Sequence, residues 1–260
     1  MMDYNFFDIN NSIKDLVTNF NRISQKGWFL KKSFDDGEVG NKFESLLGKS
    51  TDNLQVPDFY GIELKTKKIN SYDNYITLFN AVPYGKDFFE IDRLKKEYGY
   101  PDSDLKDCNV LNGDIFCKTK NRIGVKFYFQ SQIDNINQRI NLLIYNRFGK
   151  LIDNCTFWPF EIIKEKIYFK VQYLAIINVR TKFEKGRQYY KYENIEIFKV
   201  KDFESFIKAI QNDYIRIQLK IGVFKSGKRF GQTHDRGTGF QINQKYINYV
   251  YDKIYSSKKQ

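Results

Sequence analysis

Two amphipathic helices are predicted in the N-terminal part of the chain. Apolar residues recur at helical spacing over residues 13–23, behind possible N-caps at Asn11 and Ser12. A second helical pattern begins near Asp36 and ends at Gly48, since glycine readily adopts the left-handed conformation of a helix C-cap. The side chains expected on the buried face of this second helix are Val39, Phe43, Leu46 and Leu47.

The middle of the chain is predicted to be mostly β-strand. Residues 61–67 alternate between apolar and polar side chains, and residues 75–79 form a β-rich run before Pro83, so we expect two neighbouring strands. Further strands are expected at residues 123–129, 140–145 and 173–179. A turn at residues 148–150 and a helix after Pro159 complete this region.

Helical and β patterns alternate in the C-terminal third. A hairpin turn is predicted at residues 185–186, Asp202 is placed to cap a helix, and residues 225–239 form a glycine-rich basic loop. A last helix is predicted within residues 245–255. Strands are expected at residues 189–200, 214–223 and 240–242. The whole pattern predicts an α/β fold of the mixed-sheet, α+β kind.

The composition predicts a folded core and a polyanionic partner. Of the 260 residues, 42% are hydrophobic and 17% aromatic, more than a disordered chain carries. There are only 4 prolines and no Ser/Gly-rich linker, so we expect two lobes of one compact unit around a cleft. Lysine and arginine number 43 against 31 acidic residues, and the resulting net charge of +12 favours a polyanion as partner.

Several kinds of site and location are disfavoured. The single histidine, His234, excludes zinc sites and nucleases built on paired histidines. The three cysteines, Cys108, Cys117 and Cys155, form no CxxC pair, as expected in the reducing cytoplasm. No signal-peptide pattern is present, and no apolar run approaches the ~20 residues of a membrane span, so we expect no membrane partner.

The most informative polar cluster lies in residues 57–66. In a strand, Glu63 and Lys65 project from the same face about 6.6 Å apart. Ile62 and Leu64 then face the core, which leaves the polar pair on an accessible face.

Asp58 can join this pair only if the chain bends. It lies five positions before Glu63 and would point to the other side of an uninterrupted strand. Gly61 permits the required bend. We therefore expect Asp58, Glu63 and Lys65 to meet at one point.

Such a cluster has the groups needed for phosphodiester hydrolysis. Asp58 and Glu63 can bind Mg²⁺, a hard ion that takes oxygen ligands and keeps waters for a phosphate to replace. Lys65 can orient the attacking water and offset charge in the transition state. A solvated ion pair on an exposed strand is the alternative, since 28% of the residues are charged and such patterns arise by chance.

The pattern D-x4-E-x-K at residues 58–65 is similar to the active-site signature of the PD-(D/E)xK nuclease superfamily. The segments on either side of this motif make the family resemblance more specific. GEVGNKFESLLG at residues 37–48, PDFYGIELKT at residues 57–66 and TLF at residues 77–79 resemble the MvaI/BcnI type II restriction endonucleases and their mismatch-repair relative MutH. The resemblance implies a restriction-endonuclease-like core.

A fourth catalytic residue, Glu44, follows from the same resemblance. It lies at the edge of the buried arc of the second helix, one turn after Gly40, and can reach a cleft. In the resembling enzymes a glutamate on this helix joins the active-site carboxylates, which implies that Glu44 binds a second metal or a metal-bound water. An ordinary surface glutamate is the alternative.

The glycine-rich basic loop is predicted to bind DNA. Its lysines suit phosphates, whereas an arginine can bond guanine O6 and N7 with two hydrogen bonds. HDRGTGF at residues 234–240 resembles the loop that enters DNA in the same family, although relatives tend to carry a second histidine at the position of Arg236. The predicted DNA-binding residues are His234, Arg236, Thr238, Lys225, Lys228 and Arg229. A solvated hairpin is the alternative.

The resemblance implies a Mg²⁺-dependent type II restriction endonuclease with a catalytic lobe at residues 1–125 and a DNA-recognition lobe at residues 126–260. It further implies a monomer that cuts double-stranded DNA at a short CCNGG-like site, leaves 5′-phosphate ends, and works beside a cognate DNA methyltransferase. Two alternatives stay open. One is a MutH-like strand-nicking enzyme of mismatch repair, and the other is a DNA-binding protein without catalysis.

Overall fold

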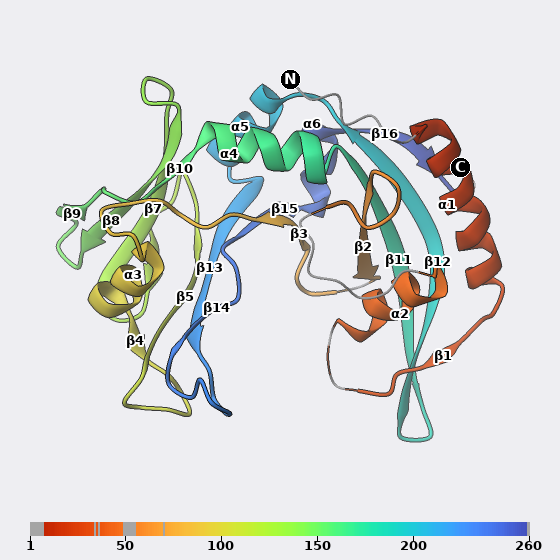
Figure 1. Ribbon diagram of the computed structural model, residues 1–260, viewed down its shortest axis with the longest axis horizontal. Helices are drawn as coiled ribbons and strands as arrows, with labels where there is room; N and C mark the ends of the chain where they lie inside the picture. Colours follow the sequence, from red (N-terminus) through yellow and green to blue (C-terminus); the bar gives the residue numbers. More distant parts are fainter. Residues whose placement is uncertain (1–7, 34, 36, 49–55, 70, 259–260) are drawn as a thin grey trace. The chain divides into compact units, whose positions relative to one another are not determined.

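The computed structural model describes residues 8–33, 35, 37–48, 56–69 and 71–258 (Figure 1). Within these residues the fold is mixed α+β, as predicted, and the strands form three sheets. The chain forms two compact units whose segments alternate along the sequence: unit 1 is Met1–Asn74, Ile167–Lys201 and Tyr251–Gln260, and unit 2 is Tyr75–Lys166 and Asp202–Val250. The units do not divide at residue 125, and the assignment of a catalytic and a DNA-recognition lobe stays a prediction.

Among its described residues, unit 1 contains one sheet, two α-helices and most of one π-helical segment. Its elements are α1 (Ile9–Ser24), β1 (Phe29–Leu30), α2 (Glu38–Leu46), β2 (Ile62–Lys68), β11 (Tyr173–Glu184), β12 (Arg187–Val200) and β16 (Tyr251–Ser256). The strand order is β1-β12-β11-β2, and β16 also pairs with β12. Strand β2 runs parallel to β11, whereas the other pairs are antiparallel.

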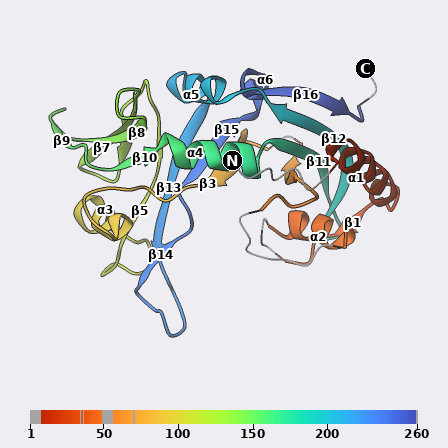
Figure 2. The same cartoon turned by 45° about the horizontal axis from the view of Figure 1, so that its top comes forward.

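The core of unit 1 lies between its helices and one face of this sheet. Figure 2 shows α1 beside the long strand β12. Side chains from α1, α2, β2, β11 and β12 form one apolar cluster, which includes Leu16, Phe20, Val39, Phe43, Ile62, Leu64, Ala175, Ile177 and Ile195. Because successive strand residues point to opposite faces, Glu63 and Lys65 point away from this core.

Unit 2 contains two sheets. The first has the order β10-β8-β7-β6 with β9 beside β8, and its strands are β6 (Asn121–Ile123), β7 (Phe127–Asp134), β8 (Arg139–Asn146), β9 (Leu151–Asp153) and β10 (Phe157–Pro159). The second has the order β3-β15-β13-β5-β4 with β14 beside β13. Its strands are β3 (Tyr75–Asn80), β4 (Tyr100–Pro101), β5 (Asn109–Ile115), β13 (Ile215–Val223), β14 (Thr233–Asp235) and β15 (Gly239–Asn243).

The helices of unit 2 are short. They are α3 (Glu90–Tyr98), α4 (Phe160–Glu165), α5 (Phe203–Gln211), the 3₁₀ turn η2 (Gln244–Tyr246) and α6 (Ile247–Val250). The π-helical segment η1 (Lys166–Lys170) begins at the last residue of the Tyr75–Lys166 part of unit 2, and its other residues belong to unit 1, where it leads into β11. Among the described residues, no helix is long and apolar enough to span a membrane.

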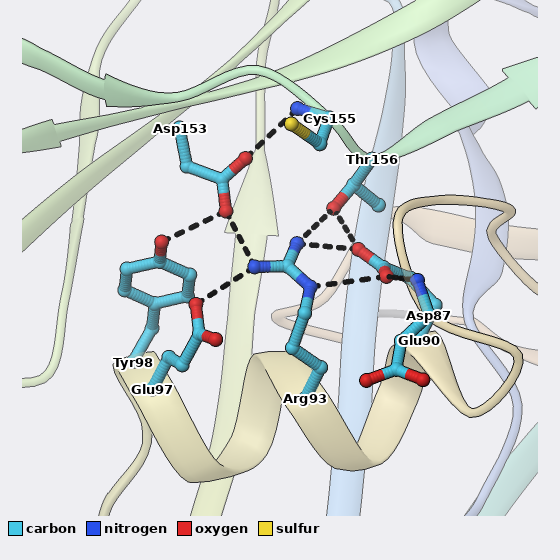
Figure 3. A network of polar contacts seen from close by, with 8 residues as sticks. All are labelled: Asp87, Glu90, Arg93, Glu97, Tyr98, Asp153, Cys155 and Thr156. Atoms are coloured by element: carbon cyan, nitrogen blue, oxygen red, sulfur yellow. Dashed lines mark hydrogen bonds and ion pairs between the residues drawn. The ribbon is translucent and has the colours of Figure 1, made fainter.

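A buried polar network fixes α3 within unit 2 (Figure 3). Arg93 donates to Glu90 on its own helix, with Nε 3.0 Å from Oε2, and to Asp153 Oδ2 at 2.6 Å. Asp153 also accepts a bond from Tyr98, and Thr156 bonds Glu90. Burial alone would raise the pKa of Glu90, but the bonds from Arg93 and Thr156 together lower it. Hydrogen-bonded charged groups therefore anchor α3 at these positions, instead of apolar packing.

Several predicted elements are confirmed. The hairpin turn at residues 185–186 joins β11 to β12 with φ of 48° and 73°, and Asp202 caps α5 by accepting a 2.7 Å bond from the amide of Ser205. Gly48 follows α2 with a φ of 85°. Asp36, near which this helix was predicted to begin, lies outside the described residues. The N-cap of α1 is Asp8 rather than Asn11 or Ser12, because its carboxylate accepts bonds from two backbone amides of the first turn.

Three predictions about strands and helices are wrong. Strands β2 and β3 are not neighbours, because β2 pairs with β11 and β3 with β15. The strand expected at residues 123–129 is divided by a turn at Gly124, whose φ is 65°, into β6 and β7. The helix expected within residues 245–255 ends at Val250, since pairing with β12 draws the following residues into β16. In the first and third cases pairing between distant segments overrides the local pattern, whereas in the second the turn at Gly124 makes a local hairpin of β6 and β7.

Candidate functional site

The segment before β2 folds back in a tight turn. Phe59 and Ile62 exchange both backbone hydrogen bonds, at 2.9 and 2.8 Å. Tyr60 and Gly61, between them, have φ of 41° and 88°. Positive φ at both central residues is the pattern of a type I′ turn, which favours glycine at its second position. The bend expected at Gly61 is therefore present.

This turn brings Asp58 back to the start of β2. Asp58 and Glu63 are the next residues on either side of the paired Phe59 and Ile62. The Oδ2 atom of Asp58 accepts a 3.0 Å hydrogen bond from the amide of Leu64. The negative charge of Asp58 is close enough to raise the pKa of Glu63, after burial, which is the larger cause. The structure thus brings these two carboxylates together.

Glu63 and Lys65 form an ion pair, as the strand geometry predicts. Lys65 Nζ lies 2.7 Å from Glu63 Oε1, and the side chains of Lys65 and Glu63 are 28% and 2% exposed. The expectation of an accessible face is wrong for Glu63. Parallel pairing places Glu63 beside Leu174 and Lys65 beside Ile176, and both of these β11 residues are fully buried. The carboxylate therefore lies in a largely dehydrated setting, next to a lysine that still reaches solvent.

A second lysine approaches the same carboxylate. Lys170, the last residue of η1, has its Nζ 3.8 Å from Glu63 Oε1, and its side chain is 15% exposed. The sequence pattern does not reveal this residue, because it is far from the D-x4-E-x-K motif along the chain. Only the parallel pairing of β2 with β11 brings the end of η1 to Glu63.

Glu44 is half-buried on α2, the helix that packs against β2. One turn earlier, Gly40 lies close to β2, since a Cβ built there would be 3.4 Å from Thr66 Oγ1. The position of Glu44 at the edge of the buried face of α2 agrees with the helical wheel. Its catalytic role stays a prediction.

The basic loop contains a short strand, β14, that the sequence pattern did not suggest. His234 lies on this strand and stacks on Phe224, with ring centroids 4.2 Å apart and planes 12° apart. The guanidinium of Arg229 lies 4.0 Å from the centroid of the same Phe224 ring. Thr233, beside His234, bonds Asp92 and Lys95 of α3. His234 and Arg229 are therefore held by aromatic contacts with Phe224, and polar contacts of Thr233 tie β14 to α3.

The other predicted DNA-binding residues differ in exposure. Lys228 and Arg236 are exposed. Lys225 is paired with Asp102 at 3.0 Å and Asp104 at 2.6 Å. The pKa of Asp102 is lowered to about 2. The larger cause is a hydrogen bond from the backbone amide of Asp104, and the next is the hydrogen bond from Lys225.

Thr238 is the exception among the predicted DNA-binding residues. Its side chain is fully buried, and within the described residues its hydroxyl has no hydrogen-bond partner. A side chain in this position supports the loop from beneath instead of presenting a surface. The preceding residue, Gly237, has a φ of 88°, and a Cβ there would lie 2.6 Å from the Asn80 amide. Only glycine fits this close approach.

Comparison with known proteins decides the family. A model of the MvaI/BcnI restriction endonuclease family matches residues 17–251. The chain belongs to the MvaI/BcnI restriction endonuclease family. It is therefore a member of a family of type II site-specific nucleases, as the sequence resemblance implied. No curated protein matches the chain.

Solved structures of a member of the MvaI/BcnI family are similar to the chain. A structure described as "Restriction endonuclease MvaI-cognate DNA substrate complex" has 28% identity and a TM-score of 0.84, and the match covers 97% of this chain and 98% of that one. A second, "Restriction endonuclease MvaI in the absence of DNA", has 28% identity and a TM-score of 0.57 over 94% and 97% of the two chains. The mixed α+β fold is thus that of a restriction endonuclease.

Membership of the MvaI/BcnI family implies use of a divalent metal ion, and the chemistry of Glu63 fits one. Its Oε2 atom is buried and has no hydrogen-bond partner in the described part of the chain, whereas Oε1 faces two lysines. Burial raises the pKa of Glu63, and the positive charges of Lys65 and Lys170 oppose this. A cation at Oε2 would compensate the buried charge and satisfy the free oxygen.

The described residues contain no ready-made group of three or more His, Cys, Asp or Glu side chains around a metal position. Asp58 and Glu63 would therefore have to share the ion with water molecules. Mg²⁺ suits such a site, since it usually keeps several waters and is bound through one or two carboxylates.

Proposed function

We propose that the protein is a Mg²⁺-dependent restriction endonuclease that hydrolyses double-stranded DNA and leaves 5′-phosphate and 3′-hydroxyl ends. The supporting observation is the buried Glu63 carboxylate beside Asp58, with one oxygen bound to Lys65 and the other without a partner among the described residues. The similar MvaI structure is a complex with cognate DNA substrate, which supports double-stranded DNA as the ligand of this chain.

Each residue of the cluster has a role in this proposal. Asp58 and Glu63 hold Mg²⁺, which stabilises the negative charge that develops on the phosphate. Lys65 is partly exposed, and its ammonium group orients the attacking water and offers a proton donor to a phosphate oxygen. Glu44 assists by holding a metal-bound water or a second ion.

In this proposal the basic loop binds the DNA backbone and recognises the base sequence. Arg236 and His234 contact base edges, Arg229 contacts a base or a phosphate, and Lys228 contacts the backbone. Lys225 must exchange its aspartate partners for a phosphate before it can contribute. Thr238 shapes the loop from its buried position.

The finer properties come from the family resemblance. We infer a monomer that cuts the two strands in turn at a short, nearly palindromic site of the CCNGG kind. A cognate DNA methyltransferase would protect the host DNA. The free thiols of Cys108, Cys117 and Cys155 agree with a cytoplasmic location.

Digestion of a supercoiled plasmid of known sequence with Mg²⁺, followed by sequencing of the ends, tests the proposal. Discrete linear fragments with 5′-phosphates at one repeated sequence are expected. Persistent nicking that needs an activating protein would indicate a strand-nicking enzyme of the MutH kind. Binding to the plasmid without any cleavage, over a range of divalent ions, would indicate a DNA-binding protein without catalysis.

A further inference from the structure

Two ammonium groups converge on one oxygen of a buried carboxylate. Lys65 Nζ and Lys170 Nζ lie 2.7 Å and 3.8 Å from Glu63 Oε1, while Glu63 Oε2 has no partner among the described residues. The two lysines lie at one oxygen of the carboxylate, and the other oxygen is buried without a hydrogen-bond partner among the described residues. The second lysine belongs to the π-helical segment η1, a rare conformation that is frequent at functional sites.

The two lysines act on Glu63 in different ways. The 2.7 Å contact of Lys65 is a charge-assisted hydrogen bond that orients the carboxylate. The 3.8 Å contact of Lys170 is too long for a hydrogen bond, so Lys170 contributes its positive charge rather than orientation. Glu63 is only 1% exposed, and a buried carboxylate without counter-charge would be costly; Lys65 supplies the nearer counter-charge, and the charge of Lys170 lowers the cost further.

The same positive charge opposes a divalent cation. An ion at Oε2 would lie on the same carboxyl group that Lys170 already compensates, and the two cations would repel each other across a poorly hydrated site. A DNA phosphate changes this balance, because it offers Lys170 another anion. The side chain is 15% exposed and has a flexible four-carbon stem with which to reach one.

We propose that Lys170 adds to the counter-charge that Lys65 provides for Glu63, takes the place of the metal ion's charge in the DNA-free protein, and so makes divalent-metal binding dependent on DNA. This inference rests on the proposed function of Asp58 and Glu63 as metal ligands. Lys170 is a positioning residue here, since it acts through Glu63. Its effect would keep the enzyme free of a reactive metal site until DNA is bound.

The test measures Mn²⁺ binding to the DNA-free protein by electron paramagnetic resonance. Lys170→Met should bind Mn²⁺ about tenfold more tightly than the wild type, because a nearby positive charge is removed. Lys170→Arg keeps the charge and should bind like the wild type. Lys14→Met, on the exposed side of α1, is the matched control and should also have no effect.

A second measurement tests the dependence on DNA. In single-turnover cleavage of a plasmid, the Mg²⁺ concentration for half-maximal rate should fall by less than about threefold in Lys170→Met, because in the wild type the phosphate already neutralises the lysine. Equal shifts with and without DNA would overturn the inference. So would unchanged or weaker Mn²⁺ binding by Lys170→Met, or by Lys170→Gln if the methionine variant does not fold.

Failure of this inference can be distinguished from failure of the proposed function. In the Lys170→Met background, Asp58→Asn and Glu63→Gln should abolish the Mn²⁺ signal of the site. If these double variants bind Mn²⁺ as tightly as Lys170→Met alone, the metal site itself is misassigned. If Asp58→Asn and Glu63→Gln lose Mg²⁺-dependent cleavage of DNA while Lys170→Met binds Mn²⁺ like the wild type, only the role of Lys170 is wrong.

Discussion

The backbone amide of Leu64 donates a 3.0 Å hydrogen bond to Oδ2 of Asp58. This bond ties a side chain from before the turn to the strand that carries Glu63 and Lys65. A D-x4-E-x-K pattern in a straight strand would separate its two carboxylates. The turn and this hydrogen bond together convert a linear motif into a compact site.

The turn itself gives a first prediction. Gly61→Ala places a side chain at a φ of 88° and should cost about 1–2 kcal/mol of unfolding free energy. It should also displace Asp58 and lower the cleavage rate. Gly149→Ala, at a φ of 81° with nothing within 4 Å of the added Cβ, is the matched control. It should lose similar stability in urea unfolding and keep full activity, whereas equal activities in both variants would refute the role of the turn.

The buried network around α3 gives a second prediction. Arg93→Met leaves the carboxylates of Glu90 and Asp153 buried without their cation, so we expect a loss of about 3–5 kcal/mol in unfolding free energy. The exposed pair of Arg180 and Glu193, at 2.7 Å, provides the comparison. Arg180→Met should change stability only slightly. Similar losses in the two variants would show that burial does not set the strength of the Arg93 network.

Arg236 is expected to carry sequence discrimination. If it makes a two-bond contact to a base, Arg236→Ala should reduce the preference for the cognate site by about 1–3 kcal/mol, with a smaller change in affinity for random DNA. Lys228→Ala should instead weaken binding to all sequences and reduce the salt dependence. Competition binding with cognate and random duplexes measures both. Uniform weakening by Arg236→Ala would assign that residue to the DNA backbone.

Asp235 predicts a pH effect on stability. Burial raises the pKa of its carboxyl above the ordinary value of 3.8, against an opposing bond from the Gly237 amide. Between 3.8 and the raised pKa the native protein holds more protons than the unfolded chain, so stability should fall as pH rises through this window.

Asp235→Asn cannot titrate and should lack this component of the fall. Urea unfolding from about pH 4 to pH 7 measures it, with Asp252→Asn, at a side chain that is 68% exposed, as the control. Parallel stability curves for the wild type and Asp235→Asn would contradict the prediction.

Local patterns in the sequence predicted much of the fold. The amphipathic period placed α1 and α2, and the alternation in β2 placed Ile62 and Leu64 in the core beside a polar pair. Glycine marked two left-handed positions, Gly61 and Gly48, for the same steric reason. Each of these features depends on residues close together in the chain.

The parts that were not predicted depend on distant contacts. The parallel pairing of β2 with β11 buries Glu63 and brings Lys170 to it, and no local pattern indicates either result. The capture of residues after Val250 into β16 likewise follows from pairing with β12. The meeting of Asp58 with Glu63 was therefore predictable from sequence, but the burial of Glu63 and its second lysine were not.

Single-turnover cleavage of a plasmid by Glu63→Gln tests the central claim most directly. The control is Glu204→Gln, because Glu204 pairs with Lys208 at the same 2.7 Å distance on the exposed surface of α5. With Mg²⁺, we expect the wild type and Glu204→Gln to cut at equal rates and Glu63→Gln to be at least ~100-fold slower while still binding DNA. Cleavage by Glu63→Gln at the wild-type rate would contradict the account.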